Sequence, residues 1–219
     1  GRFEGMDRLR VQRMQADAEL AAGELEAAIG RVRRLVGTPA ESKDERAVQL
    51  DLSVKLLRLA GLQGDQAGAD QASVLAEALI AASWAGSPAD AFDQTANLTS
   101  ALNEAGRFAD SDRIGRAALE RVTALKRAAA EKRDEGADRV DVSDHALQRV
   151  LAEQLRVEVE LGRWTQARAL LLENPWWGVR DAGDLLPDTV SSDRKPVGYY
   201  VAQVARNTGE PAIARRVLE

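Results

Sequence analysis

The sequence predicts an all-α protein, and three observations support this prediction. Ala and Leu are abundant, which favours helices, whereas Phe, Trp and Tyr together make up only 4% of the chain. Apolar residues recur at helical spacing along most of the 219 residues. Short turns that contain Gly separate the periodic stretches. A chain of this length can bury a sizeable core, in one large domain or two small ones.

Residues 3–36 are predicted to form the first helical segment, because their apolar side chains recur mostly every three to five positions. Gly23 and Gly30 are candidate breaks within it. The segment has no evident partner in a repeat. We therefore expect residues 1–37 to cap the rest of the molecule or to pair with a second copy in a homodimer.

The second helix is predicted to begin at Thr38-Pro39-Ala40-Glu41 and to end near residue 62. This tetrapeptide combines a capping hydroxyl, a Pro at the first helical position and an acid three residues after the cap. A turn follows at Gly61-Leu62-Gln63-Gly64, and a third helix is expected over residues 70–85. The predicted apolar stripe of the third helix consists of Val74, Leu75, Ala78, Leu79 and Ala82.

Ser87-Pro88-Ala89-Asp90 repeats the same capping chemistry and predicts a fourth helix to about residue 102. After Gly106, residues 109–134 form the longest predicted helix. The first half of this helix is amphipathic, whereas residues 126–134 are mostly charged or Ala. Its far end is therefore expected to protrude into solvent.

Ser143 is predicted to cap a sixth helix, which extends to residue 161. A short seventh helix is expected over residues 165–173, where Pro175 ends it. The helical pattern then fails over residues 174–195. A loop of about 20 residues without its own periodicity is typical of functional or mobile segments.

Helical periodicity returns at residues 196–207, and a last helix is expected after Gly209. Aromatic pairs stand on both sides of the irregular loop, Trp176-Trp177 at its start and Tyr199-Tyr200 after its end. Amphipathic aromatic side chains are favoured as anchors in binding sites. The competing interpretation is that Trp176 or Trp177 fills the space between helices.

Four short turns share a pattern when their sequences are aligned on Gly64, Gly106, Gly162 and Gly209. The fifth residue after each Gly is small, so two antiparallel helices can approach closely beside the turn that Gly permits. The residues eight and four before the Gly are apolar, except before Gly162. Stacking such helix pairs side by side would bury their open apolar faces continuously.

Two of these turns resemble the turn between the helices of a tetratricopeptide repeat (TPR): Leu161-Gly162-Arg163-Trp164-Thr165-Gln166-Ala167 and Glu104-Ala105-Gly106-Arg107-Phe108-Ala109-Asp110. Standard repeats have about 34 residues, whereas the glycines of the four turns lie 42, 56 and 47 residues apart. Gly115 also replaces a large residue of the family pattern.

This resemblance implies a TPR-like α-solenoid of antiparallel helix pairs over residues 38–219. An irregular helical bundle is the alternative fold. In the TPR family, the concave groove formed mainly by the first helices of the pairs binds peptide segments or partner helices. The resemblance therefore implies the same kind of groove in this chain.

Composition excludes several classes of function. A net charge of −5 and a pI near 5.2 argue against nucleic-acid binding, which needs clustered Lys and Arg. No apolar run approaches the roughly 18 residues that cross a bilayer, so no membrane insertion is expected within the segment. The absence of Cys excludes disulfides and thiolate metal sites.

Two observations concern the source of the chain. Arg far outnumbers Lys and Ala is abundant, which is typical of a GC-rich bacterial genome. A cytoplasmic location is slightly favoured over a periplasmic one. Because the chain begins with Gly1 and not with Met, we expect it to be a piece of a longer protein.

No residue pattern points to catalysis. The single histidine, His145, follows Ser143 and Asp144 at a predicted helix start, where a capping cluster is a simpler interpretation than a Ser-His-Asp triad. One His without Cys cannot supply a closed zinc site. The chain has neither a calcium-loop pattern nor a Gly-rich phosphate loop. We therefore expect no enzyme activity, no cofactor and no metal.

The sequence thus predicts a non-enzymatic interaction module that binds a peptide or protein partner. The alternative is a ligand-sensing regulatory region of a larger bacterial signalling or transcription-regulating protein. Candidate partner-binding residues combine the aromatic residues with polar positions on predicted first helices of the pairs. They are Gln154, Glu158, Trp176, Trp177, Tyr199, Gln203 and Arg206.

Overall fold

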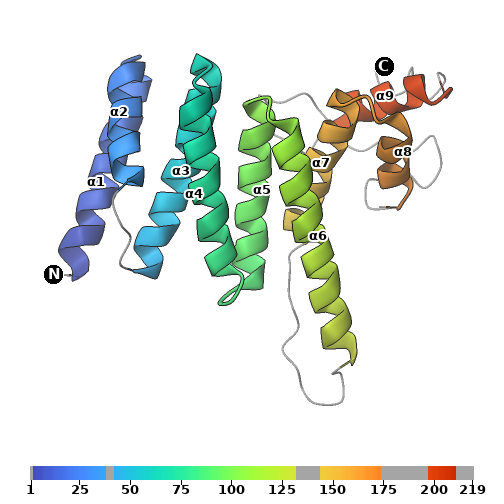
Figure 1. Ribbon diagram of the computed structural model, residues 1–219, viewed down its shortest axis with the longest axis horizontal. Coiled ribbons are helices and arrows are strands. Elements are labelled where there is room, and N and C mark those ends of the chain that lie inside the picture. Colours follow the sequence, from blue (N-terminus) through green and yellow to red (C-terminus); the bar gives the residue numbers. More distant parts are fainter. Residues whose placement is uncertain (1, 38–41, 132–143, 174–196, 211–219) are drawn as a thin grey trace.

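A computed structural model describes residues 2–37, 42–131, 144–173 and 197–210, and these segments contain nine α-helices and no strand (Figure 1). The all-α prediction is therefore confirmed for the described part of the chain. The helices are α1 (Arg2–Ala21), α2 (Leu25–Val36), α3 (Lys43–Gln63), α4 (Gln66–Ser83), α5 (Pro88–Glu104), α6 (Phe108–Glu131), α7 (Asp144–Glu160), α8 (Trp164–Glu173) and α9 (Val197–Asn207).

Some predicted features lie outside the described residues. They are the capping tetrapeptide at 38–41, the irregular loop with Trp176 and Trp177, and the last helix at 211–219. The second predicted helix, α3, begins at Lys43, after the predicted start, because Ser42 and Glu45 form a capping box. Each side chain bonds the backbone N–H of the other residue, with both N···O distances at 3.1 Å.

The helices pack in a regular order. Every helix packs against the next one in sequence, and every odd-numbered helix also packs against the next odd-numbered helix. In the described part of the chain, no two even-numbered helices contact each other to a similar extent. The odd-numbered helices thus form a continuous layer, and the even-numbered helices lie along it. Figure 1 shows this succession from α1 to α9.

The same turn follows each odd-numbered helix. Gly23, Gly64, Gly106, Gly162 and Gly209 are the described residues with positive φ, between +69° and +85°. The N–H after each Gly donates to the carbonyl four residues before that Gly, over 2.7–2.9 Å. This is the Schellman arrangement, which favours Gly because the left-handed conformation strains other residues.

Four of these turns were predicted, and Gly23 adds a fifth. Residues 2–36 therefore form a pair of helices, and Gly30 lies inside α2 without breaking it. The small residue five positions after the Gly is also present in this pair, as Ala28. It is buried in the described pairs, where Ala28, Ala69, Ser111 and Ala167 are at most 2% exposed.

Side chains join consecutive turns at matched positions. The five turns make four consecutive pairs. In three of these pairs, the residue after the later turn Gly forms an ion pair with the sixth residue after the earlier turn Gly. The first pair of turns uses Arg33 and Asp65 instead. Such half-exposed pairs contribute about 0–1 kcal/mol each, so they specify register more than stability. The three matched pairs are Asp70–Arg107 at 2.7 Å, Asp112–Arg163 at 2.6 Å and Arg168–Glu210 at 2.9 Å.

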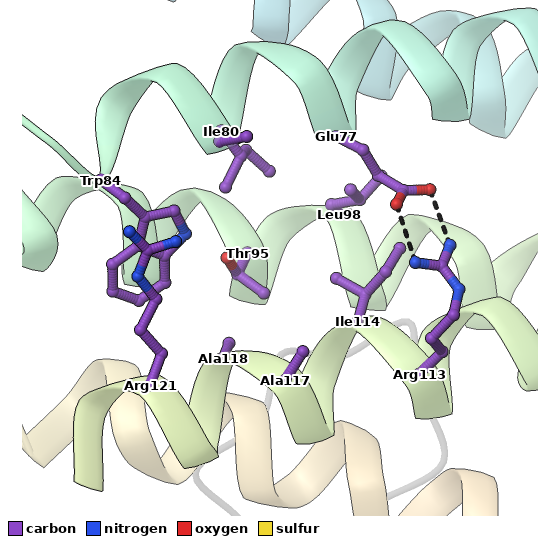
Figure 2. A pocket seen from close by; sticks show the side chains of 11 residues that line it. Glu77, Ile80, Trp84, Thr95, Leu98, Arg113, Ile114, Ala117, Ala118 and Arg121 are labelled. Carbon is purple, nitrogen blue, oxygen red and sulfur yellow. Dashed lines mark hydrogen bonds and ion pairs between the residues drawn. The ribbon is translucent and has the colours of Figure 1, made fainter. Parts of the chain in front are cut away.

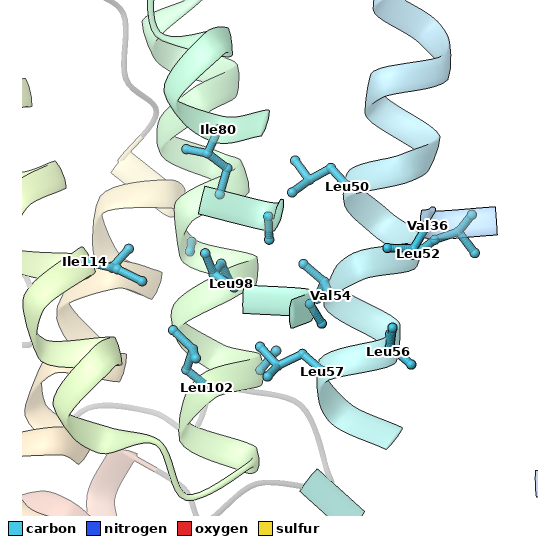
Figure 3. Close-up of a cluster of buried hydrophobic side chains, with 14 of the residues drawn as sticks. Val36, Leu50, Leu52, Val54, Leu56, Leu57, Ile80, Leu98, Leu102 and Ile114 are labelled. Atoms are coloured by element: carbon cyan, nitrogen blue, oxygen red, sulfur yellow. The ribbon is translucent and has the colours of Figure 1, made fainter. Parts of the chain in front are cut away.

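One cluster of buried apolar side chains extends from α1 to α7, and a second joins α7, α8 and α9. Figure 3 shows the first cluster between α3 and α5, where Leu57 points toward Leu102. Gly61 lets these helices meet, because a Cβ there would lie only 2.7 Å from the Ala105 Cβ. The core thus depends on close approach as well as on large side chains.

Only part of the predicted apolar stripe of the third helix is confirmed, because Leu75 and Leu79 pack against the core and the other predicted residues do not. Val74 is 68% exposed, whereas Ala72, Ala76 and Ile80 are buried in α4. The fully buried residues of α4 are mostly small, which allows the close packing of this helix against α3. The helix also begins at Gln66, before the predicted start, because Asp65 caps it through the Gly68 N–H.

The longest described helix, α6, extends past the end of α5 (Figure 1). Its residues 126–128 are exposed, which agrees with the predicted protrusion. None of the described helices combines the length and the apolar character that crossing a membrane would require.

Candidate functional site

Two grooves lie between neighbouring even-numbered helices, with the intervening odd-numbered helix as their floor. The α4–α6 groove has a volume of about 210 Å³ and the α6–α8 groove about 330 Å³. They occupy equivalent places in successive helix pairs. The floor residue eight positions before the turn Gly is Leu98 in the first groove and Gln154 in the second.

The α4–α6 groove is mainly apolar, and its charged side chains contact other residues of the groove (Figure 2). Arg113 donates two hydrogen bonds to Glu77, both at 2.9 Å. The Arg121 guanidinium lies 4.7 Å from the centre of the Trp84 ring, a cation–π distance. The groove is therefore spanned by contacts within the chain.

The α6–α8 groove has a polar floor. Gln154 of α7 is only 3% exposed, and its Nε2 donates to the Ser111 carbonyl of α6 over 3.2 Å. This side chain occupies the space beside Gly115, where a Cβ would lie 2.2 Å from Nε2. Gln154 and Gly115 both depart from the family pattern, and the structure shows that the two departures fit each other.

Glu158 lies one turn beyond Gln154 on the same floor, with a side chain only 4% exposed. Arg116 of α6 bonds its Oε1, and Asp112 accepts hydrogen bonds from both Arg116 and Arg163. Arg163 Nη1 lies 3.8 Å from Glu158 Oε2, within ion-pair range but beyond hydrogen-bond distance. Among the described residues, Oε2 therefore has no hydrogen-bond partner.

The two carboxylates of this cluster have opposite pKa shifts. Burial raises the pKa of Glu158 above its ordinary value, and the attraction of Arg116 does not cancel this effect. Burial also acts to raise the pKa of Asp112, but hydrogen bonds from Arg116 and Arg163 outweigh it, so its pKa is lowered. Asp112 thus holds both arginines, while Glu158 is the less completely stabilised anion.

The walls of the groove are partly apolar and carry further acids. Leu119 of α6 and Leu170 of α8 line it, together with the exposed side chains of Glu120 and Glu173. Among its lining residues, Arg116 is the only base against three glutamates. The groove is therefore an acidic surface with apolar walls.

The predicted site residues fall into separate groups. Gln154 and Glu158 are buried in the floor of the α6–α8 groove. Tyr199, Gln203 and Arg206 lie on α9 and do not line this groove. Trp176 and Trp177 lie outside the described residues. Whether any of these side chains binds a partner stays a prediction.

The three α9 residues follow one stripe of the helix, and Arg206 is the exposed one. Tyr199 is half-buried and meets the ring of Tyr200 edge to face at 5.5 Å. Burial raises the pKa of Tyr200 to about 12, as expected for a phenol held in a core. Gln203 is half-buried and Arg206 is exposed. Tyr200 therefore belongs to the core, and Tyr199 packs against its edge.

Sequence reasoning missed the groove walls because it placed recognition on the first helices of the pairs. The wall positions repeat at fixed distances from the turn Gly, since Ile114 and Leu170 both lie eight residues after it. This spacing could have indicated equivalent grooves. The wall residues of the α6–α8 groove are Arg116, Leu119, Glu120, Gln166, Ala169, Leu170 and Glu173.

In the described part of the chain, no group of three or more acidic or His side chains is placed to hold a metal ion. His145 is exposed near the start of α7. No family model, curated protein or solved structure matches the chain.

Proposed function

We propose that the chain is a TPR-like α-solenoid and a non-enzymatic interaction module, which binds a peptide or protein partner in the α6–α8 groove. The recurring Schellman turn and the matched ion pairs support the repeat. The observation that carries the binding function is the groove of about 330 Å³, with its polar floor and apolar walls. Pockets with a few polar groups among apolar side chains are typical of binding sites.

The TPR resemblance implied a different face, formed by the first helices of the pairs. On the odd-numbered helices, side chains of neighbouring helices pair with one another. These side chains already have partners within the chain, whereas the α6–α8 groove leaves a space that a partner can enter. This comparison favours the groove. The pairs are Arg13–Asp51 at 2.9 Å, Arg58–Glu104 at 2.7 Å and Arg149–Asn97 at 2.5 Å.

The volume of the groove limits what enters it. At about 330 Å³ it lies near the lower end of the range for ligand pockets, roughly 300–1,000 Å³. One or two side chains of an extended segment fit such a space. The rest of the partner then lies along the rims of α6 and α8.

Filling the groove from within is expected to weaken peptide binding. Peptides are first selected from a random displayed library on the full chain, and their dissociation constants are measured by fluorescence anisotropy. Ala169→Trp places a large side chain in the groove, because Ala169 lines its wall. We expect this variant to raise the dissociation constant about tenfold or more, which corresponds to roughly 1.4 kcal/mol.

Ala82→Trp is the matched control, because Ala82 is an exposed residue of an even-numbered helix and does not line either groove. It should leave the dissociation constant unchanged. Equal affinities for both variants would place binding elsewhere. If no peptide is selected and small molecules instead raise the melting temperature, a ligand-sensing function replaces the one proposed.

A further inference from the structure

We infer that the α6–α8 groove recognises a cationic side chain, lysine or arginine, of the partner, and that Glu158 Oε2 accepts a hydrogen bond from it. The inference deepens the proposed function, on which it rests for the identity of the partner as a peptide. It adds the chemical class of side chain that the groove selects.

The first argument is the state of Glu158. Its side chain is 96% buried, it lines the groove, and within the described residues its Oε2 accepts no hydrogen bond. A buried carboxylate oxygen without a hydrogen-bond partner costs free energy, and the Arg163 guanidinium, 3.8 Å away, does not supply that bond. A cationic donor from a partner would remove this cost with a charge-assisted hydrogen bond. A nearby cation would also lower the pKa of Glu158 and so counteract the effect of burial, which raises it.

The second argument is charge complementarity around the groove. Asp112, Arg116, Arg163 and Glu158 balance one another, with two charges of each sign. Glu120 and Glu173 then add two negative charges at the walls. An incoming cation is attracted to this rim, whereas an anion is repelled.

The third argument comes from the α4–α6 groove, where an arginine of the chain lies across the groove and pairs with a glutamate of the opposite wall. The seventh residue after the turn Gly is Arg113, and its guanidinium reaches Glu77 on the facing helix. The same position in the next pair is Ala169, whose short side chain leaves the α6–α8 groove open. The fold thus shows how an arginine lies across such a groove.

The fourth argument is the shape of the ligand that these walls suit. Lysine and arginine carry an aliphatic stem below the charged head. The stem can lie along Leu119 and Leu170, while the head reaches Glu158 on the floor. A purely apolar side chain would leave the carboxylate oxygen without a hydrogen bond.

The test uses two capped amino acids, so that it does not depend on selecting a peptide. N-acetyl-arginine methylamide is titrated into the ¹⁵N-labelled full chain, and N-acetyl-citrulline methylamide serves as its neutral isostere. We expect the amide signals of Ala169 and Leu170 to shift with the arginine probe. Its dissociation constant should be about 10- to 100-fold lower than that of the citrulline probe.

Two variants assign the effect to one carboxylate. Glu158→Gln keeps the shape and removes the charge, so the preference for arginine should disappear. Glu153→Gln is the matched control, because Glu153 is a buried glutamate of the same helix that accepts from Asn103 at 2.8 Å and does not line the groove. It should retain the preference. Circular dichroism melting curves check that both variants fold.

The outcomes separate the two proposals. Equal binding of both probes, or a preference that survives Glu158→Gln, overturns the inference about the cation. Selected peptides that bind through the groove without any Lys or Arg overturn it as well, while the proposed function stands. Conversely, a clear arginine preference without any selected peptide supports the cation site and contradicts the peptide-binding function.

Discussion

Replacing Phe92 with alanine is expected to lower the free energy of unfolding by about 3–5 kcal/mol. Phe92 of α5 has no exposed surface and is the largest fully buried side chain among the described residues. Its ring also meets Trp84 edge to face at a centroid distance of 6.5 Å. The substitution removes apolar burial and leaves a cavity in the cluster that joins α4 to α5. Urea denaturation followed by far-UV circular dichroism measures the loss.

Phe108→Ala provides the matched control, because Phe108 begins α6 and is only half-buried. A smaller loss is expected there, since less apolar surface leaves water when this ring packs. If Phe92→Ala costs no more than Phe108→Ala, the cluster around α5 does not hold the stack together as described.

Introducing a leucine at Gly115 is expected to destabilise the protein by about 1–3 kcal/mol. The added side chain needs the space of Gln154, since even a Cβ would lie 2.2 Å from Nε2 and 2.9 Å from Cδ of that residue. Gln154 is buried and would lose its hydrogen bond to Ser111 on moving away. Chemical denaturation of the variant measures the effect.

A second substitution tests the cause. Adding Gln154→Ala to Gly115→Leu frees the space, so the double variant should be more stable than the sum of the single effects predicts. Gly30→Leu is the control, because this glycine lies inside α2 with only the Arg34 Nη1 near its Cβ position, at 3.9 Å. It should be neutral or stabilising, since Leu favours helices over Gly. Additive effects at 115 and 154 would refute the complementarity.

Local patterns in the sequence were sufficient for the fold class and for most helix pairs. A turn Gly followed by a small residue is a local requirement, because both residues act within a few positions of one bend. The pattern therefore located Gly64, Gly106, Gly162 and Gly209, and the structure gives each a positive φ. Gly23 was only a candidate break, because the apolar periodicity continues across residues 3–36, and the structure shows that it fits the same pattern.

Features that depend on neighbouring helices were not predicted. The buried face of α4 depends on its packing against α3 and α5, and Val74 is exposed although it is apolar. The α6–α8 groove combines residues from three helices, and its polar floor exists because Gly115 leaves room for Gln154. From sequence alone, Gln154 and Glu158 appeared as exceptions to an apolar pattern and as candidate partner-binding residues, but their position on the floor of the α6–α8 groove was not predicted.

Hydrogen–deuterium exchange of the full chain, with and without the tightest selected peptide, tests the central claim most directly. The claim is that a stack of helix pairs presents the α6–α8 groove to a peptide partner. We predict slower exchange in α8 and in the α6 segment around Arg116 and Glu120, with α1 to α3 unchanged. Slower exchange confined to α1 to α4, or no change in α6 and α8 at saturating peptide, would contradict it.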